Sequence, residues 1–171
     1  IIPVYNQFEY TYNCLESILK NSGDIRYEVI VADDCSTDLT RELEKMAKGI
    51  CVLHNKKNLR FLLNCNKAAE SAKGKYILFL NNDTQVQAGW LEPLVKLIEK
   101  DETIGMVGSK LIYPDGRLQE AGGIIWGDGH AWNYGNGQNP ALPEFNYVKE
   151  TDYISGAAIM IRRDLWKEIG G

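Results

Sequence analysis

The sequence predicts an α/β fold in which a mostly parallel central sheet is flanked by helices. Short apolar stretches alternate with longer amphipathic stretches along the first part of the chain, as expected of repeated βαβ units with right-handed crossovers. Two of the apolar stretches end directly at acidic residues. Residues 29–32 lead into Asp33 and Asp34, and residues 77–80 lead through two asparagines to Asp83. Such continuous apolar runs are typical of strands buried on both faces of a sheet.

Each predicted strand is a short apolar run that stops at a polar or turn-forming segment. In chain order, the predicted strands cover residues 1–4, 27–32, 50–54, 76–80 and 104–108. Parallel strands place their carboxyl ends at one edge of the sheet, where open α/β folds bind ligands. The residues that follow the strands are therefore the first candidates for a functional site.

The predicted helices carry apolar residues three and four positions apart. They cover residues 8–21, 37–48, 62–72, 88–100 and 163–169. The expected inward faces are Tyr12, Leu15, Ile18 and Leu19 in the first helix, Leu39, Leu43 and Met46 in the second, and Leu91, Leu94, Val95 and Ile98 in the fourth. Ser36 or Thr37 is expected to cap the second helix.

The pattern changes after Gly108. Residues 109–150 are rich in Gly, Asn, Asp and Pro, with aromatic residues scattered among them. A weakly patterned stretch of this length inside a compact domain is typical of a functional loop region. Residues 153–161 are apolar again.

Composition excludes several classes of protein. The chain has 171 residues, 44% of them hydrophobic and 25% charged, which suits one globular domain. A formal net charge of −4 argues against a nucleic-acid partner. No apolar run approaches the roughly 20 residues that cross a bilayer. The sequence begins within a predicted strand and ends after a predicted helix, so we expect a domain truncated at both ends.

The cysteines form no CxxC pair. They are Cys14, Cys35, Cys51 and Cys65, and we expect each to be a small, buried, reduced side chain. Reduced cysteines suggest a cytoplasmic location.

Asp83 is the first candidate for chemistry. With its neighbouring amides it offers hard oxygen ligands, which suit Mg²⁺ or Mn²⁺ bridging a diphosphate. The alternative is an Asp that caps the following helix or forms an Asx turn. Asp33 and Asp34 come next, since an ionised carboxylate can accept the imide N–H of a uracil or thymine ring. Either acid could instead cap the helix that starts near Thr37.

Two further side chains suit the same edge of the sheet. Tyr5 follows the first strand, where its ring could lie against a base, although a core or surface role is the alternative. Arg60 precedes an apolar helix, and a guanidinium near a helix N-terminus suits a diphosphate. A solvated surface arginine is the alternative for Arg60.

Aromatic and glycine residues at 119–123 and 126–130 could shape a pocket for a sugar acceptor, because indole and phenol faces pack against the C–H faces of pyranose rings. We expect at least two of the four tryptophans to be core residues instead. His54 is expected at a strand end and His130 in a loop. There is no Ser-His-Asp or Cys-His grouping, no GxxxxGK and no GxGxxG after the first strand.

Taken together, the ordered motifs resemble those of glycosyltransferase family 2, in particular bacterial polysaccharide and rhamnosyltransferase-like members. The motifs are residues 1–6 (IIPVYN), residues 31–38 (VADDCSTD), residues 81–83 (NND), residues 155–157 (SGA) and the final GG. The resemblance runs over essentially the whole chain. It implies a GT-A fold, with a donor nucleotide-binding half at residues 1–108 and an acceptor-side half at residues 109–171.

The resemblance also implies inverting transfer from UDP- or dTDP-sugar to a saccharide or lipid-linked acceptor, in cell-surface polysaccharide synthesis. The donor-binding residues that it implies are Pro3, Val4, Tyr5, Asp33, Asp34, Arg60, Asn82 and Asp83, with Mg²⁺ or Mn²⁺ on Asp83. Ser155, Gly156 and Ala157 would line the acceptor side. Lipid-linked acceptors would bring such an enzyme to the inner face of the membrane.

Two features depart from the family pattern. Where the family has Asp-x-Asp, this sequence has Asn81-Asn82-Asp83, which leaves one carboxylate. The family's general base lies in a Glu-Asp type motif after the Gly-Gly pair, so we expect it beyond Gly171. Asp152 is the nearest acid upstream but does not match that motif.

Two alternatives stay open. One is a non-catalytic nucleotide-sugar-binding module of a larger protein. The other is a sugar nucleotidyltransferase, which would usually carry a glycine-rich, basic phosphate loop after its first strand. Residues 3–8 lack both features.

Overall fold

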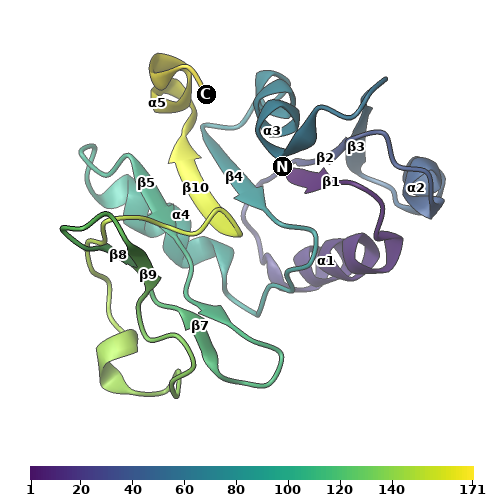
Figure 1. Ribbon diagram of the computed structural model, residues 1–171. Helices are drawn as coiled ribbons and strands as arrows, with labels where there is room; N and C mark the ends of the chain where they lie inside the picture. Colours follow the sequence, from purple (N-terminus) through teal and green to yellow (C-terminus); the bar gives the residue numbers. More distant parts are fainter.

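The first half of the central sheet is parallel, as predicted. The computed structural model describes residues 1–171, and Figure 1 shows its arrangement. Strands β1 (Ile2–Val4), β2 (Val29–Asp33) and β3 (Ile50–His54) pair in parallel in the order β1-β2-β3. The register sets Val4 beside Asp33 and Asp33 beside His54, so all three strands end at the same edge.

The second half of the sheet contains an antiparallel strand that the sequence pattern does not reveal. Strand β10 (Ala158–Arg162) lies between β4 (Tyr76–Leu80) and β5 (Met106–Gly108) and runs antiparallel to both. The central sheet therefore does not end near residue 108, because a strand from the last part of the chain completes it. Local apolar patterning predicts that a segment is buried but does not say which strand it will pair with.

Hydrogen bonds between β1 and β4 join the two halves into one layer. The Ile1 amino group donates to the Leu78 carbonyl (2.7 Å), and the Leu80 amide donates to the Ile1 carbonyl (3.0 Å). The layer thus runs β3-β2-β1-β4-β10-β5, with β1 and β4 at its centre (Figure 1).

Helices cover both faces of this layer. The side chains of α3 (Arg60–Glu70) and α5 (Arg163–Ile169) pack with Ile77 and Phe79 on one face, while α1 (Phe8–Asn21) packs with Leu80 on the other. Helix α4 (Leu91–Lys100) packs against Met160 and, through Leu78, lies on the same face as α1. Alternate residues of β4 therefore serve opposite faces, as a doubly covered strand requires.

The inward face of α1 differs from the prediction. Ile18 is buried and Leu15 packs half-buried against the same core cluster, as predicted. Tyr12 and Leu19, however, are 47% and 79% exposed, and Thr11 and Cys14 are buried instead. The segment after β4 contacts this side of the helix. The side-chain amide of Asn82 donates to the Thr11 hydroxyl (3.0 Å), and the Cys14 thiol lies 3.8 Å from the carbonyl oxygen of Asn81. The predicted inward residues of α4, Leu91, Leu94 and Ile98, are buried as expected.

The helix predicted over residues 37–48 is much shorter. It is a 3₁₀ turn η1 (Leu39–Glu42) followed by a single turn α2 (Leu43–Met46). Asp38, and neither Ser36 nor Thr37, is the N-cap, and its carboxylate accepts from the Thr40 amide (3.0 Å). Leu43 is buried, whereas Leu39 and Met46 are about half exposed, because a segment this short has only one side on the core.

Residues 109–150 contain two hairpins that the sequence did not predict. Strands β6 (Leu111–Ile112) and β7 (Leu118–Glu120) form one, and β8 (Gly123–Ile125) and β9 (Ala131–Asn133) form the other. A 3₁₀ turn η2 (Pro143–Phe145) follows. Figure 1 shows this region gathered below the sheet, away from β2 and β3.

Two of the remaining predictions concern cysteines and membrane spans. All four cysteines are free, as expected, but Cys51 is exposed on β3, the edge strand, and Cys35 is half-buried. None of the helices has both the length and the apolar character that a bilayer span requires.

Candidate functional site

Polar side chains gather where β1, β2 and β3 end. The Asp34 amide donates to the Val4 carbonyl (2.8 Å), and the Asn55 amide donates to the Asp33 carbonyl (2.9 Å). These bonds extend the ladder by one residue past each strand. Tyr5, Asp34 and Asn55 therefore follow adjacent strands at the carboxyl edge, where parallel sheets bind ligands.

A pocket of about 290 Å³ opens at this edge and is called here the edge pocket. Its lining includes five of the residues predicted to bind a donor. The lining residues are Pro3, Val4, Tyr5, Asp34, Asn58, Arg60, Phe61 and Asn64. Tyr5 is 54% exposed, so its ring is available to a ligand.

Asp34 caps the helix that forms one wall of the edge pocket. The Leu59 amide and the Asn55 side chain donate to its Oδ1 (2.7 and 2.9 Å), and the Arg60 amide donates to its Oδ2 (2.8 Å). The carboxylate thus satisfies orphan N–H groups at the start of α3 and complements the positive end of the helix dipole. A carboxylate has about four acceptor positions. One position therefore remains on Oδ2 of a side chain that lines the pocket.

Buried amides hold this cap in place. The Asn55 side chain donates to Asp34 and to Asn64 Oδ1 (2.8 Å) and accepts from Lys67 (2.7 Å). The Asn64 side chain in turn donates to the Ala32 carbonyl (2.8 Å). Asn55 was not predicted from the sequence, although it follows β3 as Asp34 follows β2. The rule that polar residues at strand ends are site candidates would have found it. Nothing in the sequence marked Asn58, Phe61 or Asn64.

Three basic side chains lie in or next to the edge pocket. Arg60 lines it, and the exposed Lys56 and Lys57 precede it in the same loop. None of these three side chains is paired with a carboxylate. The loop therefore offers unneutralised positive charge beside the edge pocket, which favours an anionic ligand.

Backbone strain is concentrated at the same edge. The non-glycine residues with positive φ are Asn6 (57°), Gln7 (63°), Cys35 (70°) and Arg60 (62°). All of them follow β1 or β2 or begin α3. Two hydrogen bonds join the loop after β1 to the loop after β2. The Asn6 backbone amide donates to Ser36 Oγ, and the Thr37 backbone amide donates to Asn6 Oδ1, each at 2.7 Å. Left-handed backbone at non-glycine residues clusters at functional sites.

Asp33 was predicted to contact the donor, but it does not line the edge pocket, because its carboxylate faces away from it. The side chain is buried, accepts from the Ser36 amide (2.9 Å) and pairs with His54 Nδ1 (2.7 Å). His54 Nε2 pairs with Glu44 at 2.7 Å, which ties β2, β3 and α2 together. Asp33 thus organises the loop that carries Asp34, and neither acid caps the helix near Thr37 as the alternative required.

The Asp33–His54–Glu44 cluster predicts a pH-dependent stability. Although burial favours the neutral imidazole, hydrogen bonds to Asp33 and Glu44 raise the pKa of His54 above its ordinary value. The stabilisation is therefore complete below the unfolded pKa of about 6.5 and is lost as the pH rises through the folded pKa. We expect the His54 contribution to the free energy of unfolding to fall by about 0.5 kcal/mol across this range, since solvent screens a partly exposed pair. The contribution is the difference between the unmodified chain and His54→Gln, because burial lowers the pKa of the Ile1 amino group to about 6 and so gives the stability a slope of opposite sign. Urea denaturation at a series of pH values measures this difference.

His54→Gln should remove the His54 contribution. His130→Gln, which replaces the chain's other histidine, should keep it. An unchanged slope in the His54 variant would contradict the assignment.

The segment after β4 meets the predicted acceptor segment. The Asn81 amide donates to the Ala157 carbonyl (2.9 Å), so residues 81–83 and 155–157 lie side by side. Asn82 is held by Thr11, in the first turns of α1, as described above. Asp83 is exposed and joins no salt bridge, which leaves its carboxylate free. Burial raises the pKa of the neighbouring Cys14 to about 11, so that thiol stays protonated at neutral pH.

The chain holds no group of three or more potential metal-ligating side chains. Asp83 is therefore a lone carboxylate in its turn, which agrees with the departure from the Asp-x-Asp pattern. Mg²⁺ commonly binds through one or two carboxylates with phosphate oxygens and water completing its shell. The donor set at Asp83 fits such a shared site and does not fit an all-protein cage.

Glu120 is a further buried acid that sequence reasoning missed. It is 2% exposed and accepts from the Ser155 amide (3.1 Å), so it holds the predicted acceptor segment to β7. Burial raises the pKa of Glu120. Its only sequence signal is its place in the glycine-rich stretch at residues 119–123.

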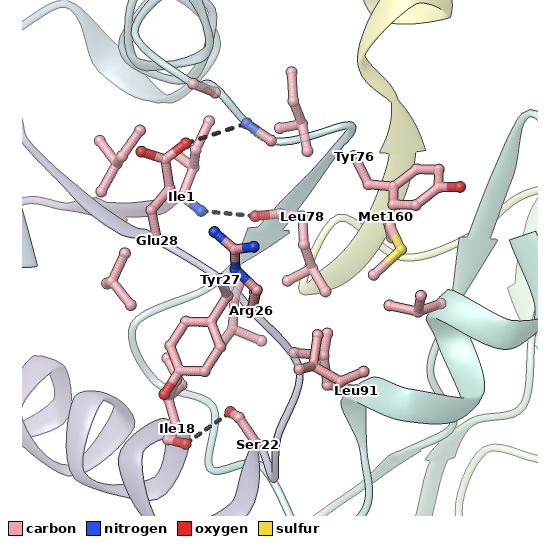
Figure 2. Close-up of a pocket in the computed structure, with 18 of the residues that line it drawn as sticks. Ile1, Ile18, Ser22, Arg26, Tyr27, Glu28, Tyr76, Leu78, Leu91 and Met160 are labelled. Atoms are coloured by element: carbon pink, nitrogen blue, oxygen red, sulfur yellow. Dashed lines mark hydrogen bonds between the residues drawn. The ribbon is translucent and has the colours of Figure 1, made fainter. Parts of the chain in front are cut away.

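A second cavity, of about 330 Å³, lies at the opposite edge, where β2 and β4 begin. Figure 2 shows mostly apolar side chains around it, including Ile1, Leu78, Leu91 and Met160. Both acids that line it already accept hydrogen bonds. Glu28 accepts from the Lys73 amide (2.6 Å), and Glu99 accepts from Lys75 (3.3 Å) and from the Tyr76 hydroxyl (3.2 Å). The polar groups that could recognise a ligand therefore converge at the edge pocket, not at this cavity.

Comparison with known proteins defines the class. The sequence profile described as Glycosyl transferase family 2 matches residues 1–170. The chain belongs to this family and is a glycosyltransferase domain.

Two of the relatives are named for the biosynthesis of teichuronic acid and of O-antigen. The chain is 33% identical over 121 residues to a putative teichuronic acid biosynthesis glycosyltransferase, TuaG, of Bacillus subtilis, covering 68% of this chain and 48% of TuaG. It is 34% identical over 114 residues to the O-antigen biosynthesis protein RfbC of Myxococcus xanthus, covering 62% of this chain and 9% of RfbC. The chain thus spans less than half of either protein.

Solved structures confirm the GT-A fold. GalNAc-T7 with UDP, GalNAc and Mn²⁺ superposes with a TM-score of 0.75 at 20% identity, over 99% of this chain and 36% of that one. The mannosyltransferase PcManGT from Pyrobaculum calidifontis, in complex with GDP-Man and Mn²⁺, gives 0.68 at 19% identity, over 99% and 45%.

Proposed function

We propose that this chain binds a UDP- or dTDP-sugar in the edge pocket and transfers the sugar, with inversion, to a saccharide or lipid-linked acceptor in cell-surface polysaccharide synthesis. The observation that carries the proposal is the convergence of Tyr5, Asp34 and Arg60 on one pocket. The pairing of residues 81–83 with 155–157 supports it. The names of TuaG and RfbC support the polysaccharide role. A lipid-linked acceptor would place the enzyme at the inner face of the membrane.

The edge pocket supplies contacts for the base and for the diphosphate of a pyrimidine nucleotide. The exposed Tyr5 ring offers a face for the base, and the free position on Asp34 Oδ2 accepts the imide N–H. Pro3 and Val4 form the neighbouring wall. The Arg60 guanidinium, with Lys56 and Lys57 nearby, balances the charge of the diphosphate.

Asp83, together with the diphosphate, would hold a divalent cation, Mg²⁺ or Mn²⁺. When bound, the cation neutralises negative charge on the leaving group. The presence of Mn²⁺ in the GalNAc-T7 and PcManGT complexes supports this role. Asn82 donates its N–H to Thr11, which leaves its amide oxygen as a second hard ligand or a water acceptor.

Transfer is a single displacement. The acceptor hydroxyl oxygen bonds to the anomeric carbon as the bond from that carbon to the diphosphate oxygen breaks, and the nucleoside diphosphate leaves. The hydroxyl proton passes to a carboxylate base, which we predict at a position after Gly171. Ser155, Gly156 and Ala157 line the acceptor side, and the buried Glu120 keeps Ser155 in place.

Calorimetric titration of UDP, dTDP and GDP, with and without Mn²⁺, tests the proposal. We expect a pyrimidine diphosphate to bind more tightly with Mn²⁺, and Asp83→Ala to weaken that metal-dependent binding at least about tenfold, or 1.4 kcal/mol. Because Asp83 is exposed and unpaired, its loss should shift the melting temperature by less than about 2 °C.

Asp24→Ala is the matched control. Asp24 is equally exposed but lies at the opposite edge of the sheet, beside the apolar cavity. It should bind nucleotide like the unmodified chain. A folded chain that binds no nucleotide, or an Asp83 variant that keeps its full Mn²⁺ dependence, would overturn the donor-site assignment.

A further inference from the structure

The β8–β9 hairpin presents an aromatic face to solvent. Its register pairs Ile124 with Trp132, and the Trp126 amide donates to the His130 carbonyl (2.8 Å). Since side chains alternate across a hairpin, these residues share one face. Trp126 and Trp132 are diagonal neighbours on it, with ring centroids 6.3 Å apart and planes at 81°.

These two tryptophans are not part of the core. Trp126 and Trp132 are 50% and 65% exposed, whereas Trp90 and Trp166 pack against buried clusters. Trp90 and Trp166 are partly buried and no tryptophan is fully buried, so the prediction that at least two of the four are core residues is met only by packing against the core. Two adjacent exposed indoles on a rigid hairpin indicate a binding surface, because folding alone gains little from leaving them in water.

The hairpin is tied to the predicted acceptor segment. The Gly123 amide donates to the Tyr153 carbonyl (3.1 Å), the Asp152 amide donates to the Gly123 carbonyl (3.1 Å), and the Ile125 amide donates to the Asp152 carboxylate (2.9 Å). The Tyr153 hydroxyl also donates to Asn133 (2.6 Å). The chain then continues directly to Ser155, so the aromatic face is held in a defined position relative to residues 155–157.

The near absence of charged side chains on the hairpin indicates which class of ligand it could bind. Residues 123–133 contain no Lys or Arg, and their only acid, Asp128, pairs with His130 at 3.1 Å. The absence of basic residues disfavours an anionic lipid surface. Indole faces bordered by exposed hydrogen-bonding groups fit a neutral ligand with apolar C–H faces and many hydroxyls, which describes a pyranose saccharide.

We propose that the Trp126–Trp132 face binds pyranose rings of the acceptor saccharide at a distance from the reacting hydroxyl. The indoles stack on the C–H faces of the rings, and Asp128 and His130 hydrogen-bond to ring hydroxyls. The inference rests on the proposed transfer to a saccharide and names the residues that recognise that acceptor.

The test is saturation-transfer NMR with neutral tetrasaccharides built from glucose, galactose, mannose or N-acetylglucosamine. At least one tetrasaccharide should bind, and Trp126→Ala/Trp132→Ala should weaken its binding at least about tenfold. Trp126→Phe/Trp132→Phe, which keeps two ring faces, should recover part of the affinity. Tyr10→Ala, which removes a 55% exposed aromatic ring from α1, should leave binding unchanged.

Parallel nucleotide calorimetry separates this inference from the donor site. The tryptophan variants should bind UDP or dTDP as the unmodified chain does. Saccharide binding that depends on the two tryptophans, without any nucleotide binding, would support the hairpin site and contradict the assignment of the edge pocket as the donor site. No tetrasaccharide binding, unchanged binding in the double Ala variant, or tryptophan-dependent binding to phosphatidylglycerol vesicles instead would overturn the inference.

Discussion

Asp34→Ala should lower the free energy of unfolding by about 3 kcal/mol and abolish nucleotide binding. The substitution leaves the part-buried Leu59 amide and one N–H of the buried Asn55 side chain without an acceptor, whereas the Arg60 amide keeps its bond to Asn58 Oδ1 (3.0 Å). Each unsatisfied buried donor typically lowers the stability by about 1–3 kcal/mol. Part of this loss is offset, because the variant no longer has to desolvate the Asp34 carboxylate on folding. Denaturant unfolding followed by circular dichroism measures the change.

Asp34→Asn is the informative partner of this variant. It keeps the shape and one acceptor oxygen, so it should retain roughly half of the lost stability while presenting an N–H toward the Arg60 amide. Nucleotide binding should still weaken, because the imide N–H of the base then meets a donor or a neutral acceptor. A loss below about 1 kcal/mol in Asp34→Ala would contradict its role as the cap of α3.

Gly123→Ala should destabilise the chain by about 2–3 kcal/mol, because the new methyl group has no space. A Cβ at this position would lie 2.1 Å from Tyr153 Cε1 and 2.2 Å from its Cζ. The clash falls where the β8–β9 hairpin packs on the segment that leads to residues 155–157. Saccharide binding should weaken together with stability, and thermal unfolding gives the size of the effect.

A control and a rescue make this prediction specific. Gly127→Ala in the same hairpin, where nothing lies within 4 Å of the new Cβ and φ is not positive, should stay within about 0.5 kcal/mol of the unmodified chain. Adding Tyr153→Ala to Gly123→Ala should cost less than the sum of the two single changes, because the clash is removed. Additive effects would show that the clash is not the cause.

The strand ends were predictable because burial and ligand position follow from short-range patterns. The apolar runs before Asp34 and Asp83 predicted two strands of one sheet, and parallel strands bring their carboxyl ends to one edge. Tyr5, Asp34 and Arg60 accordingly line one pocket. Their roles toward a nucleotide remain predictions that the calorimetry decides.

The partners of the buried acids were not predictable, because they come from distant parts of the chain. Asp34 caps a helix that starts 26 residues later, and Asp33 pairs with a histidine 21 residues away. No spacing rule separates two adjacent aspartates into a pocket residue and a loop-organising residue. The same limit applies to α1. Leu15 and Ile18 face the core as predicted, but Tyr12 and Leu19 do not, and Asn81 and Asn82 contact the Thr11 and Cys14 side instead.

By itself, then, the sequence determined the fold class, the edge of the sheet at which the edge pocket lies and the single carboxylate at Asp83. Those features depend on local apolar periodicity and on where it stops. Only the tertiary structure decided that β10 enters the sheet between β4 and β5, that Asp33 faces away from the edge pocket, and that Trp126 and Trp132 are exposed on a hairpin bonded to residues 152–153. Each of these features depends on which distant strands and loops pack together, and that packing is set by side-chain contacts between segments far apart in the sequence.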